Sequence, residues 1–269
     1  MKTILALVDF SDASANALSF AAELSKRASA RLIIMNIIQN GDGEEVTKSK
    51  LKTIESNLKK SFDSDLMCES SVAHGSFIPT LKKIVADQQP DLIVMGTKGA
   101  SGLKKILIGS NTVHVIANTR VPVFVIPEVA RFENFRNKGK NRIVLATDLD
   151  LLDNESALDI LKEIALLIIE PKVRVLSVRP KNTSLPDLKR MERDFLLSHF
   201  NPEIESDRVT IFSSNVMGGI NFYLKLKDRD TGLIAMIARD SGNLIQKHYT
   251  REMASHTHLP LLILHDTKI

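Results

Sequence analysis

The sequence predicts an α/β protein made of two tandem copies of a five-stranded parallel, open sheet with helices on both faces. Short runs that are apolar on both faces alternate with segments of helical periodicity, which is the pattern of a parallel sheet covered on both sides. The segment Lys2–Asp12, KTILALVDFSD, is echoed by Asn141–Asp150, NRIVLATDLD. The segment Thr119–Ile126 is echoed in the same way by Thr257–Leu264.

The spacing of landmarks in the two halves indicates a duplication. Asp9 and Asp148 each follow the first strand of their half and lie 139 residues apart. Pro122 and Pro260 each precede a last strand and lie 138 residues apart. Because landmarks at opposite ends of the unit agree so closely, we expect a tandem repeat. The expected domains are residues 1–128 and 141–269, joined by a polar, basic linker at 129–140.

The elements of the first copy follow one another as strand and helix. Ser11 and Asp12 are residue types that favour a helix N-cap, and apolar residues recur at helical spacing after them. Further helices are indicated by the stripes Leu51–Leu58 and Ile78–Val85, and a short fourth helix by Ser110–Asn118. The expected strands are Thr3–Val8, Leu32–Ile38, Leu66–Val72, Leu92–Met95 and Val121–Ile126, and in the second copy Ile143–Ala146, Val173–Val178, Val209–Phe212, Leu233–Ile237 and Leu261–Leu264.

Composition indicates a globular protein of a reducing compartment. Hydrophobic residues make up 43% and charged residues 25% of the chain, and the net charge is +4. Cys68 is the single cysteine, so no intramolecular disulfide can form, and we expect it to be a buried strand thiol. Asp9 ends the apolar start too early for a signal peptide, and no run is long enough to span a membrane. We therefore expect a cytoplasmic protein that binds neither membrane nor nucleic acid.

A spaced set of glycines follows the fourth strand. Gly96, Gly99, Gly109 and Ser110 form the pattern G-x2-G-x9-G-S. Glycines without a Cβ let the backbone turn sharply and lie close to a ribose or phosphate. Gly109 and Ser110 open a helix, whose free N–H groups and dipole favour an anion. Because open α/β sheets bind ligands at a switch point beyond their strand ends, the pattern predicts a polyphosphate site.

These residues resemble the universal stress protein (UspA) family, whose ATP-binding members carry G-x2-G-x9-G-[S/T]. The start Val8-Asp9-Phe10-Ser11 and the run Gln89–Gly96 are also typical of that family. The resemblance covers both halves of the chain, while the glycine motif occurs in the first half alone. It implies a Rossmann-like fold of the adenine nucleotide α-hydrolase-like type and a regulatory role in the stress response.

The resemblance also implies which residues hold the nucleotide. Asp9 and the backbone of Ile37 would meet the adenosine end of ATP. Met95, Gly96 and Gly99 would line the path of the ribose and phosphates. The phosphates would be held by Gly109, Ser110 and Asn111, with Mg²⁺ bridging the phosphates rather than sitting in a protein cage.

The second half departs from the motif. In our alignment Ala238-Arg239-Asp240-Ser241-Gly242 replaces the run from Gly96 to Gly99, and Thr250-Arg251 falls near the place of Gly109-Ser110. Asp148 survives. A Cβ on Ala238 and the bulk of Arg239 would narrow the cleft, so we expect no ordinary ATP site in this half. His256 and His258 alone are too few ligands to predict a metal site.

Three functions remain open at this point. The first is an ATP-binding regulatory protein without catalytic residues, and the second is a slow ATPase or phosphotransfer protein. The third is a nucleotide-free interaction scaffold, which is supported by the loss of the glycine motif from the second half. Walker A, G-x-G-x-x-G and G-x-S-x-G motifs are missing from the sequence. The resemblance further implies that the last strands pair within the chain as an intramolecular pseudo-dimer, with a homodimer possible, and it names no protein partner.

Overall fold

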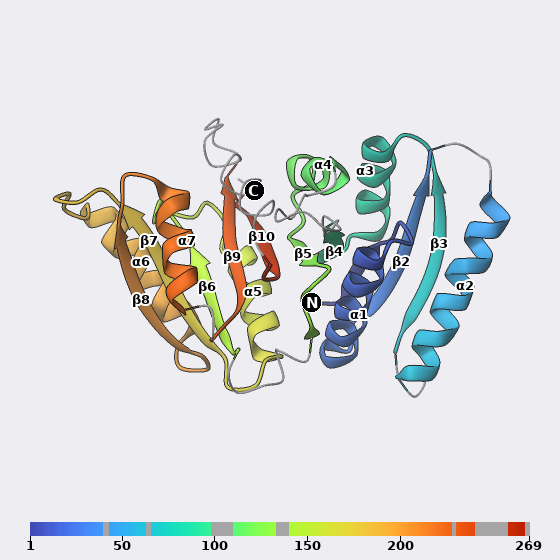
Figure 1. The fold of residues 1–269 in the computed structure, drawn as a ribbon, viewed down its shortest axis with the longest axis horizontal. Coiled ribbons are helices and arrows are strands. Elements are labelled where there is room, and N and C mark those ends of the chain that lie inside the picture. Colours follow the sequence, from blue (N-terminus) through green and yellow to red (C-terminus); the bar gives the residue numbers. More distant parts are fainter. Residues whose placement is uncertain are drawn as a thin grey trace. The chain divides into compact units, whose positions relative to one another are not determined.

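The computed structural model describes residues 1–39, 43–62, 66–97, 110–132, 140–227, 230–239 and 258–266, without the side chains of Ser110 and Lys227. The chain divides into two compact units, one built on Met1–Phe132 and the other on Glu133–Met253 and Leu259–Ile269. Strands alternate with helices along the chain, and the sheets are parallel with helices on both sides (Figure 1). The predicted fold class is confirmed. Within the described residues, no helix is long and apolar enough to cross a membrane.

The first unit holds five parallel strands in the order β3-β2-β1-β4-β5. The chain moves outward from β1 to β3 and then returns to the other side of β1, so the switch point lies between β1 and β4. Leu7 is the register partner of Met35 on one side and of Met95 on the other. The elements are β1 (Thr3–Leu7), α1 (Asp12–Ala28), β2 (Arg31–Ile38), α2 (Glu44–Ser61), β3 (Cys68–His74), α3 (Phe77–Gln88), β4 (Leu92–Thr97), α4 (Ser110–Asn118) and β5 (Val123–Pro127).

The second unit has the same strand order, β8-β7-β6-β9-β10, and all its pairs are parallel. Ala146 is the register partner of Met236, as Leu7 is of Met95. This correspondence is what a tandem arrangement predicts. The elements are β6 (Arg142–Ala146), α5 (Ser156–Leu166), β7 (Lys172–Arg179), α6 (Asp187–Phe200), β8 (Glu205–Phe212), α7 (Val216–Lys227), β9 (Thr231–Arg239) and β10 (Leu261–Asp266).

The core of the first unit continues past the end of β5. The ring of Phe20 in α1 meets Phe124 of β5 edge-on at 6.3 Å and Phe132 at 5.3 Å between centroids. The Asn16 amide donates to the carbonyls of Pro127, at 2.9 Å, and Ala130, at 3.0 Å. The stretch up to Phe132 therefore packs on α1. The predicted domain limits at 128 and 141 stay a prediction.

Glu55 fastens α2 to β3. Its carboxylate accepts hydrogen bonds from the Ser70 amide at 3.0 Å and the Ser70 hydroxyl at 2.7 Å. Lys52 and Lys59 reach the same carboxylate at 2.9 and 2.8 Å. Burial alone would raise the pKa of Glu55, but the hydrogen bonds from Lys59, Ser70 and Lys52 outweigh it and lower the pKa to about 2.

We expect Glu55→Gln to lower the free energy of unfolding at neutral pH by about 1–3 kcal/mol, because hydrogen bonds to a charged acceptor are lost. The pKa of Glu55 falls from its ordinary 4.5 to about 2 on folding, so its contribution is complete above about pH 4.5 and disappears as the pH falls toward 2. Urea unfolding followed by circular dichroism at pH 7 and pH 3 should show the difference from wild type shrinking. Glu45→Gln on the exposed face of α2 is the control, since the Glu45 side chain is 89% exposed.

Candidate functional site

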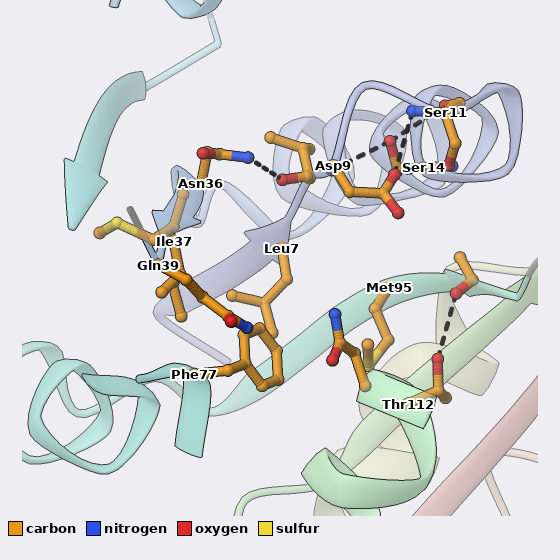
Figure 2. A pocket seen from close by; sticks show the side chains of 14 residues that line it. Leu7, Asp9, Ser11, Ser14, Asn36, Ile37, Gln39, Phe77, Met95 and Thr112 are labelled. Atoms are coloured by element: carbon orange, nitrogen blue, oxygen red, sulfur yellow. Dashed lines mark hydrogen bonds between the residues drawn. The ribbon is translucent and has the colours of Figure 1, made fainter. Parts of the chain in front are cut away.

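A cavity of about 370 Å³ lies at the carboxyl ends of β1, β2 and β4 in the first unit (Figure 2). This is the switch point of the sheet, where parallel α/β folds place their ligands, and the volume suits a small-molecule site. Its lining residues come from the strand ends and from the starts of α1, α3 and α4. They are Leu7, Val8, Asp9, Ser11, Ser14, Met35, Asn36, Ile37, Gln39, Phe77, Met95, Gly96, Asn111 and Thr112.

Five of the predicted site residues line this cavity together: Asp9, Ile37, Met95, Gly96 and Asn111. Gly99 and Gly109 lie outside the described residues. Ser110 is the first residue of α4, and its side chain is not described. The binding role of all eight residues stays a prediction.

Sequence reasoning missed several lining residues, among them Gln39 and Phe77. Gln39 directly follows β2, and Phe77 is the first residue of α3. Figure 2 shows both on one side of the cavity, away from Asp9 and Ser11. Their signal was available, because loops after parallel strands meet at one edge of the sheet. The same rule covers the residue after β2 and the connection from β3 to α3.

Asp9 is held by the start of α1. Its Oδ1 accepts hydrogen bonds from the Ser11 amide at 3.0 Å and the Ser11 hydroxyl at 2.5 Å. Ser11 is the N-cap of α1, and its hydroxyl oxygen accepts from the Ser14 amide at 3.2 Å. Phe10 between them has a positive φ of 62°, a strained conformation for a bulky residue. The cap and the turn together fix the Asp9 carboxylate at the edge of the cavity.

Asn36 and Thr112 join neighbouring elements at the cavity. The Asn36 amide donates to the Val8 carbonyl at 2.8 Å, across the ends of β2 and β1 (Figure 2). The Thr112 hydroxyl donates to the Gly96 carbonyl at 3.3 Å and so ties α4 to β4. Both side chains use their donors on the protein backbone, which gives the cavity walls fixed positions.

Gly96 is required by the packing of α1. A Cβ at this position would lie 2.9 Å from the Ser14 nitrogen and closer still to the Ala13 carbonyl oxygen. These are backbone atoms of the first turn of α1, which cannot move aside as a side chain could. We had attributed the missing Cβ at Gly96 to a close approach of ribose or phosphate. The structure places α1 on that side of Gly96, which gives this glycine a packing role, while its approach to a ligand stays a prediction.

Comparison with known proteins places the first unit in a family. Residues 1–127 match the family model described as the Universal stress protein family. Universal stress protein YxiE of Bacillus subtilis is 27% identical over 147 residues, spanning 46% of this chain and 97% of that protein. The crystal structure of a universal stress protein from Archaeoglobus fulgidus has a TM-score of 0.75 and covers 98% of both chains at 18% identity, which extends the shared fold over both units.

Residues 1–127, and with them the first unit, belong to the universal stress protein family. A further relative, universal stress protein MJ0577 of Methanocaldococcus jannaschii, is 33% identical over 82 residues, spanning 30% of this chain and 49% of that protein. The family assignment agrees with the resemblance inferred from the glycine motif. In sequence it rests on the first unit, while the second unit shares the universal stress protein fold.

The second unit departs from the universal stress protein motif in a different way from that expected. Met236 occupies the sheet position of Met95, so Ile237 stands at the place of Gly96 and Arg239 at that of Lys98. Our alignment had put Ala238 opposite Gly96, one residue too far along.

We expect Gly96→Ala to destabilise the first unit without any ligand, by about 1–3 kcal/mol, because the added methyl group overpacks against the α1 backbone. Thermal unfolding of the ligand-free protein measures this loss. Ile237→Val in the second unit is the matched control, since the same strand position already carries a side chain there. If the melting temperature of Gly96→Ala is unchanged, packing against α1 does not require this glycine, and its role concerns the ligand alone.

Proposed function

We propose that the first unit binds ATP, together with Mg²⁺ bridging its phosphates, and that the protein is a nucleotide-dependent regulator of the stress response. The observation that carries the proposal is that one cavity is lined by Asp9, Ile37, Met95, Gly96 and Asn111. These are residues that the family resemblance implies for the nucleotide, and they come from segments far apart in the chain. The universal stress protein family membership supports the same interpretation.

The two ends of the cavity suit the two ends of a nucleotide. Asn111 lies in the first turn of α4, whose leading N–H groups favour the phosphates. The phosphate end would be completed by Gly109 and Ser110, and Lys98 is a further candidate there. Ile37 and Gln39 lie at the carboxyl end of β2, and Phe77 is the first residue of α3. These three residues would enclose the base from the side opposite Asp9 (Figure 2). An aromatic ring and an amide together provide stacking and hydrogen bonding for a purine.

Catalytic turnover is not part of the proposal. Among the lining residues in the described part of the chain, Asp9 is the one with an ionisable side chain. Phosphoryl transfer to water needs a group that orients the attacking water at the γ-phosphate. In the proposed orientation Asp9 faces the adenosine end, away from the phosphates. ATP would then act as a ligand that is held rather than consumed.

We expect one ATP per chain in isothermal titration calorimetry. Gly109→Val should abolish this binding, because a branched side chain at the entry to α4 would occupy the phosphate volume. Thr250→Ala, near the corresponding place in the second half, should leave the affinity unchanged. Two equivalent sites per chain, or full binding by Gly109→Val, would contradict the proposal.

A base stacked on Phe77 makes its ring a determinant of affinity. Loss of base–aromatic stacking is worth about 1–3 kcal/mol, so Phe77→Ala should weaken ATP binding about five- to hundredfold. Phe77→Tyr keeps the stacking face and should bind within a few-fold of wild type. If the alanine and tyrosine variants bind ATP equally well, the base lies elsewhere in the cavity.

A further inference from the structure

The second unit has a different arrangement at the carboxyl end of its sheet. The loop from Asp148 to α5 is longer than its counterpart from Asp9 to α1: α5 begins at Ser156, and α1 begins at Asp12. In the first unit α1 packs on β1, β4 and β5 and comes closest at Gly96, whereas in the second unit α5 packs mainly on β10, the counterpart of β5. Because Ile237 stands at the place of Gly96, a helix cannot approach β9 as α1 approaches β4. The extra residues of the loop span the distance that results.

The backbone of this longer loop is hydrogen-bonded to buried ionic side chains. The Arg239 guanidinium donates to the carbonyls of Asp150 and Leu151, the latter at 2.6 Å. Burial raises the pKa of the Glu192 carboxyl of α6, and the nearby Leu152 backbone opposes that rise. The amides of Asp153 and Asn154 donate to the Asp266 carboxylate at 2.9 and 3.0 Å. Four residues of the loop, Asp150, Leu151, Asp153 and Asn154, thus have a backbone group bound to the side chain of Arg239 or Asp266.

Arg239 and Asp266 also bind each other. The Arg239 Nη1 lies 2.6 Å from the Asp266 Oδ2, and the two residues are register partners on β9 and β10. Arg239 is 8% exposed and Asp266 is 2% exposed. A buried ion pair costs desolvation energy and is favourable when further hydrogen bonds satisfy both groups. Here the loop backbone supplies those bonds, so the ion pair and the loop conformation stabilise each other.

Asp148 joins the same cluster. Its Oδ1 lies 3.6 Å from the Arg239 Nη2 and accepts a hydrogen bond from the Asp150 amide at 3.1 Å. Leu149 beside it has a φ of 61°, matching the 62° of Phe10 in the first unit. The counterpart of Asp9 is therefore preserved in backbone geometry, and its carboxylate faces an arginine of its own unit.

We propose that the second unit carries its own internal ligand: the Arg239 guanidinium occupies the end of the sheet in place of a nucleotide and holds the loop 150–154 closed. A polyphosphate would have to separate Arg239 from Asp266 and then approach the carboxylates of Asp148, Asp150 and Glu192. The second unit is thus a permanently closed module, and nucleotide can act on the first unit alone. The clasp of Arg239 does not depend on whether the first unit binds ATP.

Amide hydrogen exchange of Asp153 and Asn154 tests the clasp directly. Arg239→Ala should speed their exchange about ten- to hundredfold, because hydrogen bonds to charged groups of about 1.5–3 kcal/mol are weakened. Arg190→Ala is the control: it removes an arginine from the exposed face of α6, where the Arg190 side chain is 53% exposed and pairs with Asp187. The exchange of Asp153 and Asn154 should not change in this variant. Both tyrosines of the chain lie in the second half, so their fluorescence reports whether that unit is folded.

Chemical rescue separates the guanidinium from a general structural effect. Millimolar ethylguanidinium should restore the protection in Arg239→Ala, and ethylammonium at the same concentration should not. If Arg239→Ala does not fold, Arg239→Lys should still show faster exchange, because one ammonium cannot reach two carbonyls and a carboxylate in the same geometry. Wild-type exchange rates in either variant, or equal rescue by both cations, would contradict the proposal that Arg239 holds the loop 150–154 closed.

Adding ATP to the wild-type protein tests the closed state of the second unit. Protection of Asp153 and Asn154 should be the same with and without a large molar excess of ATP. A change at these amides would show that nucleotide enters the second unit, and the internal-ligand proposal would be wrong. Failure of ATP to bind anywhere would instead contradict the function proposed for the first unit, and the exchange results for Arg239→Ala would stand.

Discussion

The contact between Gly96 and the first turn of α1 is the constraint on which the first unit's cavity depends. It brings the backbone of Ala13 and Ser14 against β4. The N-cap Ser11 is thereby placed beside the end of β1, where it holds the Asp9 carboxylate. Without this approach, the wall formed by Asp9, Ser11 and Ser14 would not face the wall formed by Met95 and Asn111. A side chain that is absent thus determines the shape of the site.

The second unit lacks that constraint and is built differently at the same place. It keeps the strand order, the strand-end aspartate and the left-handed residue after it. With Ile237 at the place of Gly96, the helix begins later and packs on β10, and the loop before it needs partners of its own. Arg239 and Asp266 provide them. One fold therefore supports a lined cavity in one unit and an ionic clasp in the other.

These two outcomes reflect different ways to satisfy polar groups at the end of a parallel sheet. Strand ends and helix starts there leave backbone donors and acceptors that must be paired. In the first unit Ser11, Asn36 and Thr112 satisfy part of them and leave a cavity. In the second unit a buried arginine and two acidic residues satisfy them from within. A ligand is compatible with the first solution, whereas in the second the arginine already takes its place.

The sequence by itself determined the alternation of strands and helices along the chain, because apolar runs such as Thr3–Leu7 and Leu261–Leu264 have no other place than a buried sheet. It also determined α4 at Ser110–Asn118 and the grouping of Asp9, Met95 and Asn111, since parallel strands end at one edge. Tertiary structure alone decided the role of Gly96 and the contacts of Arg239 with the loop 150–154. The physical reason is that register and helix approach depend on contacts between residues far apart in the chain, which local pattern does not encode.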